Sequence, residues 1–292
     1  MIPAHTAIGI VGLGRMGSAM AQRLTENGFA VVGWDASAAA VAAFAASGGS
    51  VASHPRGVAE SAGIVMTSVT DDAAVREIFG GANGFLAAPL DAKLFVEMST
   101  LRPETVRALE SQIAAGGGAI VDAPLLGTIP NARAGTLTAL VGGAAADIDR
   151  AQAVFEVLAQ RVARMGKLGS GHAMKLAVNL GLAAYVQGLA ESLALGESEG
   201  LDLTQMLDVL AAAPTANAWL GARRKVVTGD AHDVTLDIRT MRKDVTSALA
   251  TGTAAGLAMP LAAGTLAAFS AAVDAGLGDR DLGEIAARRS PR

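Results

Sequence analysis

The first half of the chain alternates short apolar runs with longer amphipathic segments. The apolar runs have the length and composition of buried parallel strands and occupy residues 7–11, 30–35, 63–69, 94–100 and 119–124. Segments of helical length separate them, among them an alanine-rich stretch that ends near Ala46 and a stretch that Pro103 opens. Strands that alternate with helices across short connections form a parallel sheet with helices on both faces. The pattern therefore predicts an α/β fold with a doubly wound sheet.

The pattern changes near residue 166. Before it, two more strands at 136–143 and 162–165, and a helix from Asp147 to Gln160, are expected to complete the sheet. After Ser170 almost every segment has a helical period, with turns at Gly200, Pro214, Gly229 and Pro260. We therefore expect an α/β domain at residues 1–166 and an all-helical domain at residues 167–292.

The first strand ends in three glycines at the spacing G-x-G-x-x-G: Gly12, Gly14 and Gly17. In a dinucleotide-binding loop the first glycine permits the tight turn, the second lets a pyrophosphate approach the backbone, and the third lets the helix pack on the strand. The helix that follows offers its N-terminal amides to the phosphates. Asp35, at the end of the second strand, stands where such sites hold the ribose. This context favours a Rossmann-type nucleotide site over a structural turn in an unrelated α/β protein.

Asp35 also favours one cofactor. A carboxylate there accepts hydrogen bonds from the ribose hydroxyls of NAD and repels the 2′-phosphate of NADP. Residues 36–38, Ala-Ser-Ala, supply no arginine for that phosphate. We therefore expect NAD to be preferred over NADP. Asp35 as the cap of the following helix is the structural alternative, and it is compatible with ribose binding.

Polar residues follow several of the predicted strands. Val69 closes the third strand and Thr70 follows it, Ser99 and Thr100 close the fourth, and a loop begins after Pro124. The carboxyl ends of parallel strands share one edge of the sheet, which is where such sheets bind ligands. Each segment alone is also explained as an ordinary turn or helix cap.

The segment 173–199 carries the candidate for acid–base chemistry. Its first half is apolar nearly all round, which is typical of a buried helix. Lys175 lies in this half, and Asn179 stands one helical turn further on the same face. A buried ammonium group requires a partner or a task, so Lys175 is predicted to act in the reaction.

Composition excludes several classes of protein. The net charge of −4 and the scattered basic residues disfavour nucleic-acid binding. The chain has no cysteine, and its histidines, His5, His54, His172 and His232, lack paired ligand spacing, so no metal site is expected. No signal peptide or membrane-spanning stretch is apparent, and we expect a soluble, cytoplasmic protein.

These motifs, taken in order, resemble the β-hydroxyacid dehydrogenase family, which includes 3-hydroxyisobutyrate dehydrogenases and tartronate or succinic semialdehyde reductases. The resemblance covers nearly the whole chain. It is carried by Gly12 to Gly17 with Met20 and Ala21, Glu97 to Thr100, Asp122 to Pro124, Gly135 to Thr138, Gly169 to Gly171, Lys175 with Asn179, and Lys243 with Asp244.

The resemblance implies roles for individual residues. Lys175 matches the family's catalytic lysine, and Asn179 matches an asparagine that helps to hold substrate. Thr100 is implied beside both nicotinamide and substrate. The expected cofactor site comprises Gly12, Leu13, Gly14, Arg15, Met16, Gly17, Asp35, Val69, Thr70, Thr100 and Lys243.

Two departures from the family pattern concern the substrate. Family members commonly read D-x-P-V-S-G-G where this chain reads Asp122 to Thr128, so Leu126 replaces a serine and Thr128 a glycine. The run resembles a minority variant that includes sulfolactaldehyde reductases, which carry an arginine in place of Gly127. Val178 replaces the first of a pair of asparagines. Leu126, Gly127 and Thr128 are still expected to contact substrate.

The resulting hypothesis is hydride transfer between NAD and a short hydroxyacid or semialdehyde, with Lys175 as general acid and base. An imine reductase of the same two-domain plan and an inactive cofactor-binding module are the alternatives. Trp219 is expected to line the substrate pocket, although a large apolar residue is more often plain core. The long apolar helix suggests a homodimer or higher homo-oligomer.

Overall fold

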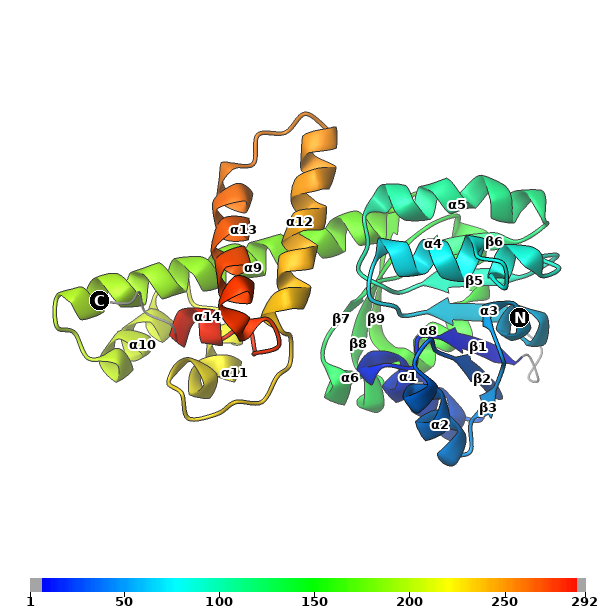
Figure 1. The fold of residues 1–292 in the computed structure, drawn as a ribbon, viewed down its shortest axis with the longest axis horizontal. Helices are drawn as coiled ribbons and strands as arrows, with labels where there is room; N and C mark the ends of the chain where they lie inside the picture. Colours follow the sequence, from blue (N-terminus) through cyan, green and yellow to red (C-terminus); the bar gives the residue numbers. More distant parts are fainter. Residues whose placement is uncertain (1–6, 288–292) are drawn as a thin grey trace. The chain divides into compact units, whose positions relative to one another are not determined.

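The structure is a computed structural model and describes residues 7–287. The chain forms two compact units, Met1–Lys175 and Leu176–Arg292. One long helix, α9 (Ser170–Ser198), contributes to both (Figure 1).

The first unit is built on one sheet of nine strands. Its path runs β3-β2-β1-β4-β5-β6-β8-β7, with β9 paired to β8. The strands from β3 to β6 are parallel, and the chain reverses its direction of winding between β1 and β4. This order is the doubly wound arrangement that the sequence predicts, with the ligand-binding switch point between β1 and β4. The strands are β1 (Ile8–Val11), β2 (Val31–Trp34), β3 (Ser50–Val51), β4 (Ile64–Thr67), β5 (Leu94–Glu97), β6 (Ala119–Asp122), β7 (Leu125–Leu126), β8 (Leu137–Gly142) and β9 (Ala159–Gly166).

The far edge of the sheet differs from the expected parallel arrangement. Strand β8 runs antiparallel to both β6 and β7, and parallel to β9. An apolar run reports that a strand is buried and not which way it runs, so the sequence pattern held no information on this reversal. The helix expected from Asp147 to Gln160 is interrupted, because α7 (Ala145–Arg150) and α8 (Gln152–Leu158) are separate and β9 begins at Ala159.

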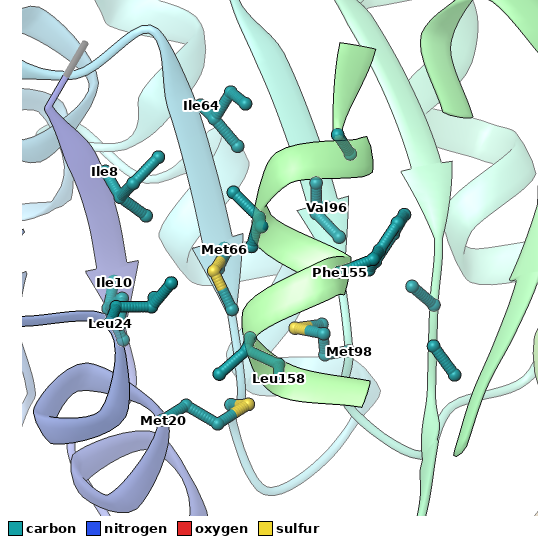
Figure 2. Close-up of a cluster of buried hydrophobic side chains, with 14 of the residues drawn as sticks. Ile8, Ile10, Met20, Leu24, Ile64, Met66, Val96, Met98, Phe155 and Leu158 are labelled. Atoms are coloured by element: carbon teal, nitrogen blue, oxygen red, sulfur yellow. The ribbon is translucent and has the colours of Figure 1, made fainter. Parts of the chain in front are cut away.

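Helices cover both faces of the sheet and enclose two apolar cores. On one face α1 and α8 pack against β1, β4 and β5, where Met66 and Phe155 are fully buried (Figure 2). On the other face Phe79, Phe85 and Phe95 form an aromatic cluster with centroid distances of 4.8 to 5.2 Å. The helices are α1 (Arg15–Glu26), α2 (Ala38–Ala46), α6 (Ile129–Ala134), α7 and α8 on the first face, and α3 (Pro55–Ser61), α4 (Asp72–Gly80), η1 (Phe85–Ala87) and α5 (Pro103–Ala115) on the second.

The second unit is helical, as the sequence predicts. Its core gathers around Val186, Leu193 and Phe269, all fully buried. Helices α12 and α13 pack side by side (Figure 1). Besides the remainder of α9, the unit contains α10 (Leu203–Ala212), α11 (Ala218–Val227), α12 (Ile238–Ala254), α13 (Pro260–Ala272), η2 (Val273–Leu277) and α14 (Glu284–Ala287).

The expectation that the chain has no membrane-spanning stretch is not met by length and composition, because helix α13 and η2 together form one candidate segment. Pro260–Leu277 is long and apolar enough to cross a membrane, and 17% of it is buried. Its helix is broken near the end, because Gly276 has a φ of +82°. Core helices of soluble proteins meet the same length and composition, so a single segment of this kind carries little weight.

Strand β5 ends in a fully buried carboxyl group. Glu97 is 0% exposed, accepts a hydrogen bond at 2.7 Å from the backbone N–H of Ser99, and accepts another from the hydroxyl of Thr67. Burial raises the pKa of Glu97 to about 7; the hydrogen bonds from Ser99 and Thr67 oppose this shift, and the neighbouring Asp122 adds to it.

This carboxyl group makes the stability of the protein depend on pH. A pKa raised from 4.5 to about 7 means that the folded chain holds the proton more tightly than the unfolded chain does. The stabilisation is therefore complete below pH 4.5 and is lost as the pH rises through 7, by roughly 3 kcal/mol in all. Urea unfolding at pH 5 and pH 8 measures this loss.

Glu97→Gln removes the titrating group and is expected to flatten the pH dependence by most of that amount. Glu110→Gln, on the exposed face of α5, is the matched control and should leave the dependence as in the wild type. Equal pH slopes for the wild type and Glu97→Gln would contradict the assignment.

Candidate active site

The glycine loop between β1 and α1 is shaped by close contacts. Gly12 has a φ of +96°, and a Cβ there would lie 2.1 Å from the carbonyl oxygen of Ser68. A Cβ on Gly17 would lie 1.8 Å from the carbonyl oxygen of Gly12. A Cβ on Gly14 would meet no atom within 4 Å among the described residues, so packing within the chain does not require this glycine. This is the pattern expected where the second glycine serves a ligand's approach.

The N-terminal turn of α1 is suited to an anion. The N-cap is Gly14, so no side chain caps the amides of the first turn, and this turn contains no acidic residue. The amides of this turn and the positive end of the helix dipole face the loop. Arg15 is exposed and Met16 is half-buried on the same turn, whereas Leu13 is buried.

Asp35 joins the glycine loop to the end of β2. One carboxylate oxygen accepts a hydrogen bond from the amide of Leu13 at 2.6 Å, and the other accepts one from the amide of Ser37 at 2.7 Å. Each oxygen keeps a second lone pair, so the carboxylate can also accept hydrogen bonds from a ribose. Asp35 therefore stands where a nucleotide ribose is expected, and it holds the glycine loop in place.

The exits of β4 and β5 are tied together by side chains. The amide of Val69 donates to the hydroxyl oxygen of Ser99 at 2.9 Å, and Ser99 is itself held by Glu97. Thr70 is exposed and Thr100 is half-buried at these exits. The two loops that were predicted to face one crevice are thus fastened as a pair.

The loop 125–128 begins with β7, which pairs with β8 through Leu125–Ala139 and Leu126–Thr138. Leu125 is buried and Leu126 is half-buried. Gly127 has a φ of +133°, and a Cβ there would lie 2.7 Å from a methyl carbon of Leu137. The amide and the hydroxyl of Thr128 both hydrogen-bond Asn131, at 2.9 and 2.8 Å.

Lys175 lies at the end of the first unit, beside this loop. Its ammonium group donates a hydrogen bond to the carbonyl oxygen of Leu125 at 2.8 Å. The side chain is half-buried, and Ala173 and Met174 are exposed, so this turn of α9 is less buried than the apolar sequence suggested. One partner of the ammonium is thus the backbone carbonyl of Leu125.

The remaining predicted residues belong to the second unit. The amide nitrogen of Asn179 donates to Asp244 at 2.6 Å, and the ammonium of Lys243 pairs with the other oxygen of Asp244 at 2.8 Å. Trp219 is half-buried, with its ring edge-to-face against Tyr185 at a centroid distance of 6.0 Å.

Three carboxyl groups with evident tasks were quoted in motifs but given no role by the sequence analysis: Glu97, Asp122 and Asp244. Glu97 and Asp122 are register partners at the ends of β5 and β6. An acidic residue that closes each of two adjacent apolar runs is the signal that points to them. Within residues 7–287 there is no group of three or more metal-ligating side chains.

The residues present fit a nicotinamide dinucleotide. Three features lie on consecutive elements of the first unit. They are Gly14, which packing within the chain does not require, the first turn of α1, which has no acidic residue, and the carboxylate of Asp35 at the end of β2. These are the groups that recognise a pyrophosphate and an adjacent ribose.

Two family profiles match the chain. Residues 7–166 match the family described as "NAD binding domain of 6-phosphogluconate dehydrogenase". Residues 169–288 match the family described as "NAD-binding of NADP-dependent 3-hydroxyisobutyrate dehydrogenase".

Two relatives are similar to this chain along most of their length. Glyoxylate/succinic semialdehyde reductase 1 of Arabidopsis thaliana is 29% identical over 95% of this chain and 96% of its own. The 3-hydroxyisobutyrate dehydrogenase of Pseudomonas aeruginosa is 32% identical over 88% of this chain and 89% of its own.

Solved structures agree with this. The 3-hydroxyisobutyrate dehydrogenase of Mycobacterium tuberculosis with L-serine has a TM-score of 0.86 at 28% identity, covering 97% of this chain and 98% of its own. An imine reductase from Myxococcus stipitatus, at 21% identity and a TM-score of 0.66, shares the fold alone. With its glycine loop, its lysine and these matches, the chain belongs to the β-hydroxyacid dehydrogenase family, as an NAD(P)-dependent oxidoreductase of the 3-hydroxyisobutyrate dehydrogenase type.

Proposed function

We propose that the protein transfers hydride reversibly between NAD and a short hydroxyacid or semialdehyde, with Lys175 as general acid and base. The observation that carries the proposal is the 2.8 Å hydrogen bond from the Lys175 ammonium to Leu125, on the loop where relatives are expected to hold substrate. The names of the relatives support the substrate class: a glyoxylate/succinic semialdehyde reductase and a 3-hydroxyisobutyrate dehydrogenase.

The bound nicotinamide supplies or accepts the hydride. During reduction the Lys175 ammonium donates a proton to the substrate oxygen, and during oxidation the neutral amine takes it back. The carbonyl oxygen of Leu125 accepts a hydrogen bond from the ammonium, which fixes the direction of the Lys175 side chain. Thr100, Val69 and Thr70 would border the nicotinamide side of the crevice.

Asn179 and Lys243 would act from the helical unit. The side-chain nitrogen of Asn179 donates a hydrogen bond to Asp244. The side-chain oxygen of Asn179 would then accept a hydrogen bond from a substrate hydroxyl. Lys243 would serve the cofactor while its ammonium is paired with Asp244. Trp219 would form an apolar wall for the substrate.

Replacing Lys175 tests the acid–base role. Lys175→Ala is expected to lower kcat for NADH-dependent reduction of glyoxylate and succinic semialdehyde by about 10²- to 10⁴-fold, since general acid catalysis contributes that much. The dissociation constant of NADH should stay within about twofold, because the cofactor loop is untouched. Lys167→Ala, at an exposed neighbouring lysine, is the control. Undiminished turnover in Lys175→Ala would remove Lys175 from the mechanism.

We further propose that NAD is preferred over NADP. The carboxylate of Asp35 repels a 2′-phosphate, so kcat/KM with NADH should exceed that with NADPH by at least about tenfold. Asp35→Ser is expected to bring the ratio toward one, while raising KM for both cofactors because the Leu13 amide loses its acceptor. Equal efficiency with both cofactors in the wild type would contradict the proposal.

The loop residues define the substrate further. Leu126 replaces the serine hydroxyl expected in relatives, and the amide of Thr128 is engaged with Asn131, so the acidic end of the substrate is held by fewer donors here. We propose that Leu126 and Trp219 favour substrates with an apolar or bulkier group, while the backbone at Gly127 and Thr128 borders the carboxylate.

Leu126→Ser tests this preference. A restored hydroxyl donor to the carboxylate is expected to raise kcat/KM for glyoxylate by about tenfold or more, the worth of one hydrogen bond to a charged group. The branched 3-hydroxyisobutyrate gains the same hydrogen bond but loses its apolar contact with Leu126, so its kcat/KM should rise less. Leu195→Ser, at a leucine that is 69% exposed, is the control. A wild-type enzyme that prefers the smallest hydroxyacids would contradict the proposed apolar pocket.

We infer that residues 167–292 serve as a substrate and dimerisation domain, next to a cofactor domain at 1–166. In the helical unit Leu257 and Leu261 are 61% and 68% exposed near the start of α13, an apolar surface that suits a second copy of the chain. A monomeric mass in sedimentation equilibrium would contradict this.

We place the protein in the cytoplasm, which the absence of cysteine permits, and cell fractionation tests the placement.

A further inference from the structure

Asp122 ends strand β6 and is fully buried, with 0% exposure. One carboxylate oxygen accepts a hydrogen bond from the amide of Gly169 at 2.7 Å, and the other accepts one from the amide of His172 at 2.8 Å. These amides flank the first residue of α9, Ser170, and amides at a helix start have no partners within the helix. A carboxylate 47 and 50 residues away in sequence therefore caps the longest helix of the chain.

The surrounding atoms leave little freedom to this arrangement. A Cβ on Gly171 would lie 2.1 Å from the carbonyl oxygen of Leu140 and 2.8 Å from the carboxylate of Asp122. A Cβ on Gly142 would lie 2.5 Å from the same carboxylate. The first turn of α9 is thus pressed against the sheet, with glycine at both points of closest approach.

The segment that begins at Asp122 also reaches the ammonium of Lys175. Three residues after Asp122, the carbonyl oxygen of Leu125 accepts the hydrogen bond from Lys175. One short segment, 122–125, therefore holds both the backbone start of α9 and the side chain of the lysine that α9 carries. A shift of the helix start would move the lysine relative to its own acceptor.

We propose that Asp122 is a positioning residue that aims Lys175, by fixing the first turn of α9 against the end of β6. This inference rests on the proposed role of Lys175 in the reaction. Burial raises the pKa of the Asp122 carboxyl, and the amides of His172, Gly169 and Gly171 oppose this by stabilising the carboxylate. The ionised form alone can accept at both oxygens without offering a donor.

Asp122→Asn keeps the shape of the side chain and removes one acceptor. Its new amide nitrogen would face a backbone N–H, so at least one of the two hydrogen bonds to α9 is lost. Unfolding transitions and NADH titration check that the variant is folded and binds cofactor. Asp208→Asn, at a side chain on α10 that is 66% exposed, is the matched control.

The first measurement needs no cofactor and no turnover. Acetic anhydride is applied in limiting amount to the cofactor-free protein, and acetylation is quantified site by site by mass spectrometry. Lys93 is the internal reference, since its ammonium also donates to a backbone carbonyl, that of Ala62 at 2.7 Å. Asp122→Asn is expected to raise labelling of Lys175 relative to Lys93 by threefold or more. An unchanged ratio in a folded variant overturns the proposal.

The second measurement is a double-mutant cycle on kcat for semialdehyde reduction. In a wild-type background Asp122→Asn is expected to lower kcat by tenfold or more, with the KM for NADH within twofold. In a Lys175→Ala background the same change should lower kcat by less than twofold, because there is no lysine left to aim. An equal loss in both backgrounds means that Asp122 acts by another route and overturns the proposal.

Arg107 provides a second variant if Asp122→Asn does not fold. Its exposed guanidinium donates to the carbonyl oxygen of Leu168 at 3.0 Å and so supports the same turn from outside. Arg107→Ala is expected to lower kcat a few-fold in the wild type and not in Lys175→Ala; equal losses overturn the proposal. If Lys175→Ala itself keeps full activity, the proposed reaction mechanism fails, while the labelling ratio still decides whether Asp122 positions the lysine.

Discussion

Where the chain passes the carboxyl edge of a parallel sheet, its backbone amides no longer have hydrogen-bond partners on a neighbouring strand. In this protein several of these amides donate to buried or half-buried carboxylates instead. Asp35 after β2, Glu97 on β5 and Asp122 on β6 each accept from amides of a loop or helix start. A carboxylate can take several such bonds at once, and charged acceptors make the stronger ones. These hydrogen bonds fix loops and a helix start at the edge of the sheet where ligands are expected.

Each carboxylate secures a different part of the site. Asp35 holds the glycine loop, Glu97 holds the paired exits of β4 and β5, and Asp122 holds the start of α9. Burial makes the arrangement costly for Glu97 and Asp122, whose pKa values it raises. Buried carboxyl groups of this kind occur often near functional sites.

The sequence allowed much of this to be anticipated, and the reasons are physical. Gly12, Gly17 and Asp35 lie where steric and electrostatic requirements restrict the choice of residue. Their spacing, together with the strand before the loop and the helix after it, therefore predicted a nucleotide-binding loop. The direction of β8 and the break between α7 and α8 escaped prediction, because apolar periodicity records burial and not chain direction. The acceptor of Lys175 escaped it too, since a backbone carbonyl leaves no mark on the sequence.

The left-handed conformation at Gly127 restricts which side chains this position can carry. Any side chain introduced there meets Leu137 and a backbone that only glycine adopts freely, so a cationic group for a sulfonate cannot simply be installed at this point. Leu126, half-buried on the preceding strand, is under no such restraint. Of these two positions, 126 is therefore the one at which a side chain of different charge can be introduced without a strained backbone.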